Sequence, residues 1–471
     1  MIWEITTLLL LAVYVYTILT TIIFLMMENR NPVKSIAWIF VLIFVPIFGF
    51  LFYILVGKRF RKRRIINKRS YRIREGNQIM EEEFPDTEMN TFERGIAKLA
   101  YNNSGAVLCA NNNVKIYTNA TLLFDDIEKA ILEAQKHINI EYYIFNSDKI
   151  GTRIMDALKK KAQEGVEIRM IVDDVGSIKL KKKDIKSLIA HGIQVMSFLE
   201  VRLPYINSRV NYRNHRKILV IDGEIGFTGG YNIADRYIYG LSWGPWRDTH
   251  IKVEGSVVSE LQKSFFEDWY FVKQELVDDA RFYPTPTAKG NSLMQIVISG
   301  PDLIWESIMQ CYIKAFLEAQ KRIYIETPYF LPPESVISAL QSAALNNIDV
   351  RIILPYRSDA QLTLFSTYSY LDQMFKAGVK IYLYQEGFIH SKITIVDDTS
   401  FVGSSNMDFR SFNQNFELNA IIYDKEKTKE FTEIYFEDIK HSNELDFDTW
   451  KKRPLQQRLK ESSARLFSPI L

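Results

Sequence analysis

Two short segments of the 471-residue chain repeat one arrangement of chemically active side chains. The first, NHRKILVIDGEIGFTGGYN, begins at residue 214, and the second, HSKITIVDDTSFVGSSN, begins at residue 390. Each opens with a histidine and a lysine two residues apart, His215 with Lys217 and His390 with Lys392. An apolar strand pattern follows, so the two side chains of each pair share one face of a strand. Lysine cations hold phosphate oxygens, and histidine serves as nucleophile or as acid and base.

The residues after each strand complete an expected anion site. Small residues let a phosphate approach the backbone, while amides and a hydroxyl add hydrogen-bond donors. These residues are Gly229, Gly230 and Asn232 in the first copy and Gly403, Ser404 and Asn406 in the second. We expect one histidine to attack phosphorus, the other to protonate the departing oxygen, and the lysines to stabilise the developing charge. Because the lysines supply positive charge, neither a metal nor another cofactor is expected.

Four acidic residues accompany these motifs. Asp222 and Asp397 belong to the repeated catalytic pattern, but each lies at an odd offset from its histidine and lysine. Strand parity turns them away from the phosphate and predicts a structural role. Asp248 and Glu417 each open the next apolar strand, 33 and 27 residues after the histidine of their own copy. We expect these two to hold the second ring nitrogen of that histidine and so fix its tautomer.

The elements before each motif also recur in one order. KHINIEYYIF at 136–145 is matched by KRIYIETPYF at 321–330, and a helix pattern followed by a strand pattern comes next in both copies. Alternation of strands and helices is typical of α/β units. The sequence therefore predicts an α/β fold with two homologous α/β/α halves sharing one active site, residues 96–285 and 286–471, preceded by residues 1–57 and a linker at 58–95.

The N-terminal region carries two long uncharged stretches, residues 5–27 and 35–57. Each is long enough to cross a bilayer as a helix, which predicts a transmembrane hairpin. Ten lysines and arginines follow within residues 58–75. The positive-inside rule places this segment, and hence the catalytic domain, on the cytoplasmic side of the cell membrane, where it also meets anionic headgroups. The expected protein is an integral, multi-pass membrane protein.

Composition limits the remaining possibilities. The net charge of +3 gives no argument for a nucleic-acid partner, and the two cysteines, Cys109 and Cys311, have neither metal-ligand spacing nor a disulfide framework. The motifs alone leave open a phosphodiesterase that uses water or another alcohol as acceptor. An inactive membrane scaffold is disfavoured because both histidine–lysine pairs are intact. The C-terminal segment from residue 453 can be drawn as an amphipathic helix against either membrane or domain.

The pattern HxKxxxxD followed by GGxN or GSxN, present twice, resembles the phospholipase D superfamily. The N-terminal region together with WRDTHIKVEG, IETPYFLP and SSNMDFRSFNQNFELNA resembles the bacterial cardiolipin synthases. This resemblance implies transfer of a phosphatidyl group between two phosphatidylglycerol molecules, giving cardiolipin and glycerol through a phosphohistidine. It also implies that His215 is the nucleophile and His390 the general acid. The two copies differ at Gly230, where the second has Ser404, and the second turn is one residue shorter.

Overall fold

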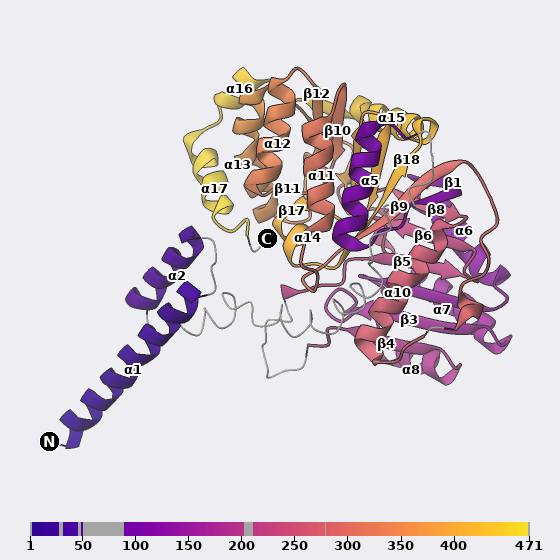
Figure 1. Ribbon diagram of the computed structural model, residues 1–471, viewed down its shortest axis with the longest axis horizontal. Helices are drawn as coiled ribbons and strands as arrows, with labels where there is room; N and C mark the ends of the chain where they lie inside the picture. The colour runs from indigo at the N-terminus through magenta and orange to yellow at the C-terminus, as the bar shows by residue number, and fades with distance from the viewer. Residues whose placement is uncertain are drawn as a thin grey trace. The chain divides into compact units, whose positions relative to one another are not determined.

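The computed structural model describes residues 2–27, 32–45, 49, 89–201, 211–277 and 279–469. The chain forms two compact units, one of residues 1–65 with 201–210 and one of residues 66–200 with 211–471. The first unit contains the apolar N-terminal helices, and the second contains both repeated motifs. Each unit is described separately below (Figure 1).

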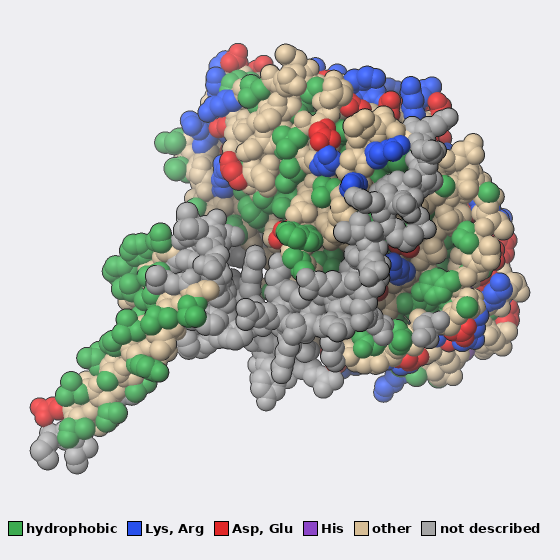
Figure 2. All heavy atoms as spheres, viewed as in Figure 1, with side chains coloured by type: hydrophobic (Ala, Val, Ile, Leu, Met, Phe, Trp, Pro, Cys, Tyr) green, Lys and Arg blue, Asp and Glu red, His purple; other side chains and the backbone are tan. Residues whose placement is uncertain are grey.

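Two neighbouring helices make up the described part of the first unit, α1 (Ile2–Met27) and α2 (Pro32–Phe44). Residues Trp3–Ile23 of α1 are long and apolar enough to cross a membrane, with a mean hydropathy of 2.0. Figure 2 shows apolar side chains around the visible surface of this helix. The hydroxyl groups of Thr17 and Thr20 donate to carbonyls one turn earlier, so these polar groups are satisfied within the helix. The first predicted span is thus a helix.

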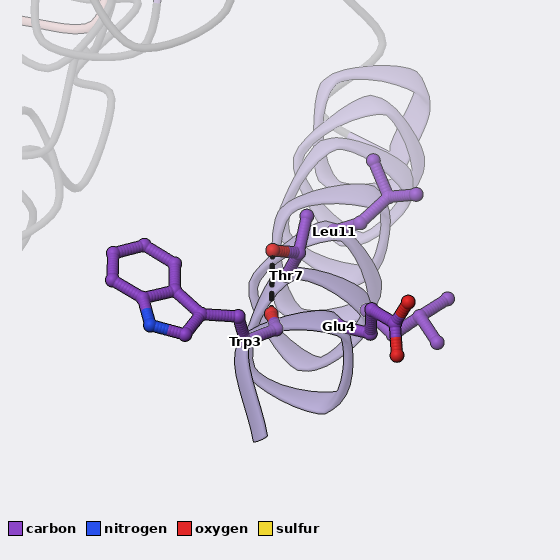
Figure 3. Close-up of a pocket in the computed structure, with 5 residues that line it drawn as sticks. Trp3, Glu4, Thr7 and Leu11 are labelled. Carbon is purple, nitrogen blue, oxygen red and sulfur yellow. Dashed lines mark hydrogen bonds between the residues drawn. The ribbon is translucent and has the colours of Figure 1, made fainter. Parts of the chain in front are cut away.

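The second predicted span is covered only in part, because α2 ends at Phe44 and residues 46–48 and 50–57 lie outside the described part of the chain. The basic segment at 58–75 lies outside it as well. A shallow hollow on α1, lined by Trp3, Glu4, Thr7 and Leu11, is shown in Figure 3. In it the Thr7 hydroxyl donates to the Trp3 carbonyl at 2.8 Å. All of its lining comes from one apolar helix, so it is not a candidate for chemistry.

The second unit is built on one 15-stranded mixed sheet. The first half contributes β1 (Cys109–Tyr117), β2 (His137–Tyr142), β3 (Glu167–Asp173), β4 (Gln194–Phe198), β5 (Lys217–Ile221), β6 (Ile225–Gly229) and β8 (His250–Glu254). The second half contributes β9 (Ser292–Ser299), β10 (Arg322–Glu326), β12 (Asp349–Pro355), β13 (Lys380–Tyr384), β15 (Ile393–Val396), β16 (Thr399–Gly403), β18 (Glu417–Tyr423) and β19 (Ser442–Glu444).

The strand order shows the internal repeat. It runs β19-β13-β12-β10-β15-β16-β18-β9-β1-β8-β6-β5-β2-β3-β4, so each half reads the same way outward from the antiparallel β1–β9 pair at the centre, and β19 is extra. Two parallel pairs of short strands complete the unit: β7 (Trp246–Arg247) pairs with β14 (Phe388–Ile389), and β11 (Phe330–Leu331) with β17 (Met407–Asp408). Two α/β halves, as the sequence predicts, therefore form one continuous sheet.

Helices cover both faces of this sheet. On the second half α5 (Thr91–Ser104), α11 (Ser307–Glu318), α12 (Glu334–Leu345) and α13 (Gln361–Ala377) stand side by side (Figure 1). The first half carries α6 (Ala120–Glu133), α7 (Lys149–Gln163), α8 (Lys182–Ala190) and α10 (Val257–Lys273). The remaining helices are α9 (Arg236–Tyr239), a 3₁₀ turn (Ala280–Phe282), α14 (Phe409–Asn413), α15 (Lys425–Lys440), α16 (Phe447–Lys451) and α17 (Leu455–Arg465).

One hydrophobic core is common to both halves. Trp269 and Phe265 of α10 belong to the same buried cluster as Phe431 and Tyr435 of α15. Burial of such large side chains is a major source of stability, so the two halves are held as one body. The C-terminal segment packs on the domain: Glu461 and Ala464 of α17 are buried where that helix lies against α13.

Candidate active site

Both histidine–lysine pairs lie at the starts of equivalent strands, next to the boundary between the halves. Lys217 is the first residue of β5, and Lys392 directly precedes β15. The four side chains are buried, with 8% of His215 and 7% of His390 exposed. The backbone N–H of His215 donates to Phe416 O at 2.9 Å, and that of His390 donates to Arg247 O at 2.7 Å. Each histidine is thus held by the backbone of the other half.

The acidic partners of the histidines also cross this boundary. His215 Nδ1 lies 3.0 Å from both carboxylate oxygens of Glu417, and His390 Nδ1 lies 2.7 Å from Asp248 Oδ2. The two acids that the sequence predicted are correct, but the expected pairing within each half is wrong. Spacing along the chain does not reveal that β7 pairs with β14 and that Asn214 bridges Phe416, contacts that bring each acid to the opposite histidine.

The lysines complete one cationic cluster. Lys217 Nζ donates to His215 O at 2.6 Å, and Lys392 Nζ donates to His390 O. Burial lowers the pKa of Lys217 to about 7 and that of Lys392 to about 8, although the charges of Glu417 and Asp248 oppose this. Lys392 contributes to the lowered pKa of Lys217. The dyads of the two halves therefore act on each other electrostatically, as the groups of one shared site do.

The charge states follow from burial and from these neighbours. Burial lowers the pKa of His215, which Glu417 opposes, and burial with the Lys392 charge lowers the pKa of His390 to about 3. Burial alone would raise the pKa of Asp248, but Lys392 and His390 bring it to about 2. These pKa shifts give neutral imidazoles beside an ionised carboxylate near neutral pH. A proton on Nδ1 of His215, shared with Glu417, leaves the Nε2 lone pair free for attack.

The small residues after each strand make room for these carboxylates. The Ser404 hydroxyl donates to Glu417 Oε2 at 2.5 Å, and its expected donation to the phosphate stays a prediction. At the equivalent place in the first half, a Cβ on Gly230 would lie 1.8 Å from Asp248 Oδ1. The hydroxyl is missing there because the carboxylate itself fills that space. Each copy thus has the small residue that suits its neighbouring acid: Gly230 leaves space for Asp248, and Ser404 donates a hydrogen bond to Glu417.

The two motif asparagines have different surroundings. Asn232 is buried, accepts from the Ile144 N–H at 3.1 Å and donates to the Tyr237 hydroxyl at 2.8 Å. It braces the loop after β2, a structural task in addition to the donor role expected from the sequence. Buried Asn406 has a side-chain oxygen with no hydrogen-bond partner among the described residues.

The motif aspartates lie in the turns at the far ends of β5 and β15. Asp222 accepts from the backbone N–H groups of residues 135, 136 and 137 at 2.7–2.9 Å, and Asp397 accepts from those of residues 320, 321 and 322 at 2.8–3.0 Å. Both have positive φ, 55° and 53°. These contacts agree with the orientation that strand parity predicts, and the inclusion of the two aspartates among the catalytic residues stays a prediction. They tie the hairpin to the start of the neighbouring strand.

The contacts that two aromatic side chains and one arginine make at the site were not predicted from the sequence. The Tyr143 ring packs on the His215 ring at 5.0 Å between centroids, and Trp246, a buried member of the core of the first half, packs on His390 at 4.9 Å. Arg247 forms a bidentate ion pair with Asp438 and donates to the Asp248 carbonyl, which ties β7 to the second half. The only available signal was position: Trp246 and Arg247 directly precede Asp248.

The two cysteines are poor candidates for chemistry. Both cysteines are buried and free, and burial raises the pKa of each thiol to about 12. Within the described residues, no group of three His, Cys, Asp or Glu side chains is arranged to hold a metal ion. The chemically active groups that the repeated motifs bring together are two histidines and two lysines, with the carboxylates of Glu417 and Asp248 on the histidines.

Known proteins with the same sequence pattern identify the family. Residues 127–269 and 312–439 match the family model described as "Cardiolipin synthase, PLD-like domain", and residues 12–58 match "Phospholipase_D-nuclease N-terminal". The cardiolipin synthase of Alkalihalophilus pseudofirmus is 39% identical over 95% of this chain and 91% of its own length. The chain belongs to the cardiolipin synthase family. The cardiolipin synthase of Listeria monocytogenes is likewise similar, with 40% identity over 94% of this chain and 95% of its own length.

A solved structure agrees at the level of fold. Phosphatidylserine synthase from Haemophilus influenzae superposes with a TM-score of 0.63 and 16% identity, covering 81% of this chain and all of that chain. As a member of the cardiolipin synthase family, the chain is a phosphatidyltransferase of the phospholipase D type. In this chain, each of the two regions that match the family model contains one histidine–lysine pair of the shared site.

Proposed function

We propose that the protein joins two phosphatidylglycerol molecules into cardiolipin and releases glycerol. The proposal rests chiefly on the crossed arrangement, in which two buried histidines, each oriented by a carboxylate from the opposite half, share one pair of lysines. Such a centre supplies one nucleophile, one acid and base, and fixed positive charge for a single phosphodiester. Membership in the cardiolipin synthase family selects the substrate class.

In the first step Nε2 of His215 attacks the phosphorus of the donor lipid. The bond from phosphorus to the headgroup oxygen breaks, and His390 gives that oxygen a proton, so glycerol leaves and a phosphatidyl group remains on His215. Glu417 supports the positive imidazole that forms. His390 must be protonated for this step. Because its pKa is about 3, mainly through burial, the anionic phosphate has to raise that pKa on binding.

In the second step a hydroxyl of the headgroup of a second phosphatidylglycerol attacks the same phosphorus. His390, neutral after the first step, takes the proton from that hydroxyl, and the bond from phosphorus to His215 breaks. Cardiolipin leaves with both histidines returned to their starting states. Lys217 and Lys392 hold the equatorial oxygens in both steps, so we expect turnover to persist in a metal chelator.

Lipid mass spectrometry on the purified full-length protein tests this function directly. With phosphatidylglycerol as the only lipid, the expected products are cardiolipin and one glycerol for each cardiolipin. Phosphatidic acid in place of cardiolipin would mean that water is the acceptor, which is the alternative left open by the motifs. His390→Ala serves as the control for contaminating activity.

The membrane arrangement is also proposed. Residues 5–27 and 35–57 cross the cell membrane as two helices, and the ten basic residues at 58–75 keep the catalytic domain on the cytoplasmic side beside anionic lipids. Single cysteines placed within 28–34 and near residue 80 distinguish the orientations by labelling in intact cells. Labelling of the first position alone is expected, and external labelling near residue 80 would contradict this orientation.

A further inference from the structure

Two equivalent arginines near the site form no ion pair within the part of the chain that the structure describes. Arg236 and Arg410 each follow the motif asparagine of their half by four residues. Both are partly buried, and in each the Nε atom is buried without a hydrogen-bond partner among the described residues. Other arginines at this boundary are paired, as Arg216 is with Asp268 and Arg247 with Asp438. An unpaired buried guanidinium nitrogen is costly, and its occurrence at the same place in both halves points to an anionic ligand.

Ring contacts place Arg236 toward His390. The Arg236 guanidinium carbon is 5.1 Å from the centroid of Trp246, and the Trp246 ring packs on His390 at 4.9 Å between centroids. Tyr143, whose ring packs on His215, is affected by both arginines: burial raises its pKa, and the charges of Arg410 and Arg236 oppose that rise. The contact with Trp246 is therefore what places Arg236 at the His390 side of the site.

The reaction requires a second anion on one side of the site only. A displacement at phosphorus places the attacking and leaving groups roughly in line on opposite faces. If His215 holds the phosphatidyl group, the acceptor hydroxyl approaches from the side of His390. An acceptor phosphatidylglycerol brings its own phosphate, separated from that hydroxyl by the three-carbon glycerol chain, and the charge of this phosphate is repelled by that of the donor. Glycerol and water bring no such charge.

We propose that Arg236 binds the phosphate of the acceptor lipid and thereby directs the phosphatidyl group to phosphatidylglycerol in preference to neutral acceptors. This inference rests on the proposed function. The guanidinium also donates to the Tyr237 hydroxyl at 3.3 Å, and Asn232 donates to the same hydroxyl. Asp359 of the second half acts on Arg236 through its charge but lies beyond ion-pair distance, and its carboxylate already accepts from the Tyr329 hydroxyl at 2.7 Å.

The test compares two acceptors in one reaction. Full-length protein in phosphatidylglycerol vesicles is given labelled glycerol, and two rates are measured: formation of cardiolipin and incorporation of label into phosphatidylglycerol. Both rates share the phosphatidyl-histidine step, so their ratio reports the choice of acceptor. Arg236→Gln is expected to lower the ratio of cardiolipin formation to glycerol exchange by about 10- to 100-fold, the effect of losing one hydrogen-bonded charge pair. Arg236→Lys, which keeps the charge, should retain most of the ratio.

Two matched variants distinguish binding of the acceptor phosphate by Arg236 from an indirect structural effect of its loss. Arg410→Gln, at the equivalent place in the second half, should lower both rates together and leave their ratio within about twofold, well inside the effect of one hydrogen bond. Tyr237→Phe removes the hydroxyl shared by Arg236 and Asn232 and should also leave the ratio unchanged. The inference is overturned if Arg236→Gln lowers both rates equally, or if Tyr237→Phe reproduces its effect on the ratio. Wild-type protein that exchanges glycerol but makes no cardiolipin would instead refute the proposed function.

Discussion

The two halves of the catalytic domain hold equivalent histidines by different local means. In the second half Ser404 donates to Glu417, and this longer acid reaches His215. In the first half Gly230 leaves room for Asp248, and this shorter acid reaches His390. The two halves therefore differ both in the small residue and in the acid beside it. The distance from the histidine Nδ1 to the carboxylate is nevertheless similar, 3.0 Å for His215 and 2.7 Å for His390. The contact that orients each ring is preserved although the residues that supply it are not.

The strongest test of this comparison removes either histidine. His215→Ala and His390→Ala should each lower turnover by about 10⁴-fold or more, as loss of a nucleophile or its partner does in other covalent enzymes. The double variant should be little worse than either single one, because both residues serve the same phosphorus. Cardiolipin formation in detergent micelles measures this, with circular dichroism to verify folding. Near wild-type turnover in either single variant would contradict a shared site.

Exchange of the small residues should have unequal effects in the two halves. Gly230→Ser forces its side chain into the space of Asp248 Oδ1, so we expect turnover to fall about 100-fold or more, as for displacement of a catalytic orienting group. Ser404→Gly removes one hydrogen bond from Glu417 and should lower turnover only about tenfold. In the double variant Gly230→Ser with Asp248→Glu, which copies the second half, part of the loss should be recovered. Equal losses at 230 and 404 would contradict the match between small residue and acid.

The buried lysines predict an alkaline limit on substrate capture. Burial lowers the pKa of Lys217 to about 7 and that of Lys392 to about 8, so each lysine is protonated below its value and neutral above it. Because both protonated lysines bind the anionic donor, kcat/KM should fall about tenfold for each pH unit between pH 7 and 8 and about 100-fold for each unit above pH 8. The limit on kcat should lie at higher pH, since a bound phosphate favours the charged lysines. A flat kcat/KM between pH 6 and 9 would exclude this account.

The motif aspartates should have the smallest effect on turnover. Asp222→Asn and Asp397→Asn keep a residue that tolerates positive φ but lose the negative charge that accepts three backbone N–H groups. We expect each to lower the free energy of unfolding by about 1–3 kcal/mol and turnover of the folded enzyme by no more than a few-fold. Thermal unfolding and turnover of the soluble fraction measure both quantities. Stable but inactive variants would contradict the structural role.

Local rules predicted much of this arrangement. The alternation of strands and helices indicated two α/β halves, and the period of two along β5 and β15 placed Asp222 and Asp397 away from the phosphate. The crossing of Asp248 and Glu417 between halves was not predictable, because it depends on how β7 meets β14 across the pseudo-symmetric boundary. The contacts of Ser404 with Glu417 and of Trp246 with His390 were not predictable either, because they depend on how distant elements of the fold meet.

The crossed assignment is tested most directly with a donor whose leaving group needs no proton, such as a phosphatidyl ester of p-nitrophenol. Release of p-nitrophenolate in the first step then depends on His215 and its partner Glu417, but not on His390 and its partner Asp248. The account predicts that Asp248→Asn keeps a rapid burst of p-nitrophenolate close to that of the wild type, whereas Glu417→Gln slows the burst by about 100-fold or more, the loss of an orienting carboxylate. A burst lost in Asp248→Asn and kept in Glu417→Gln would show that each acid serves the histidine of its own half.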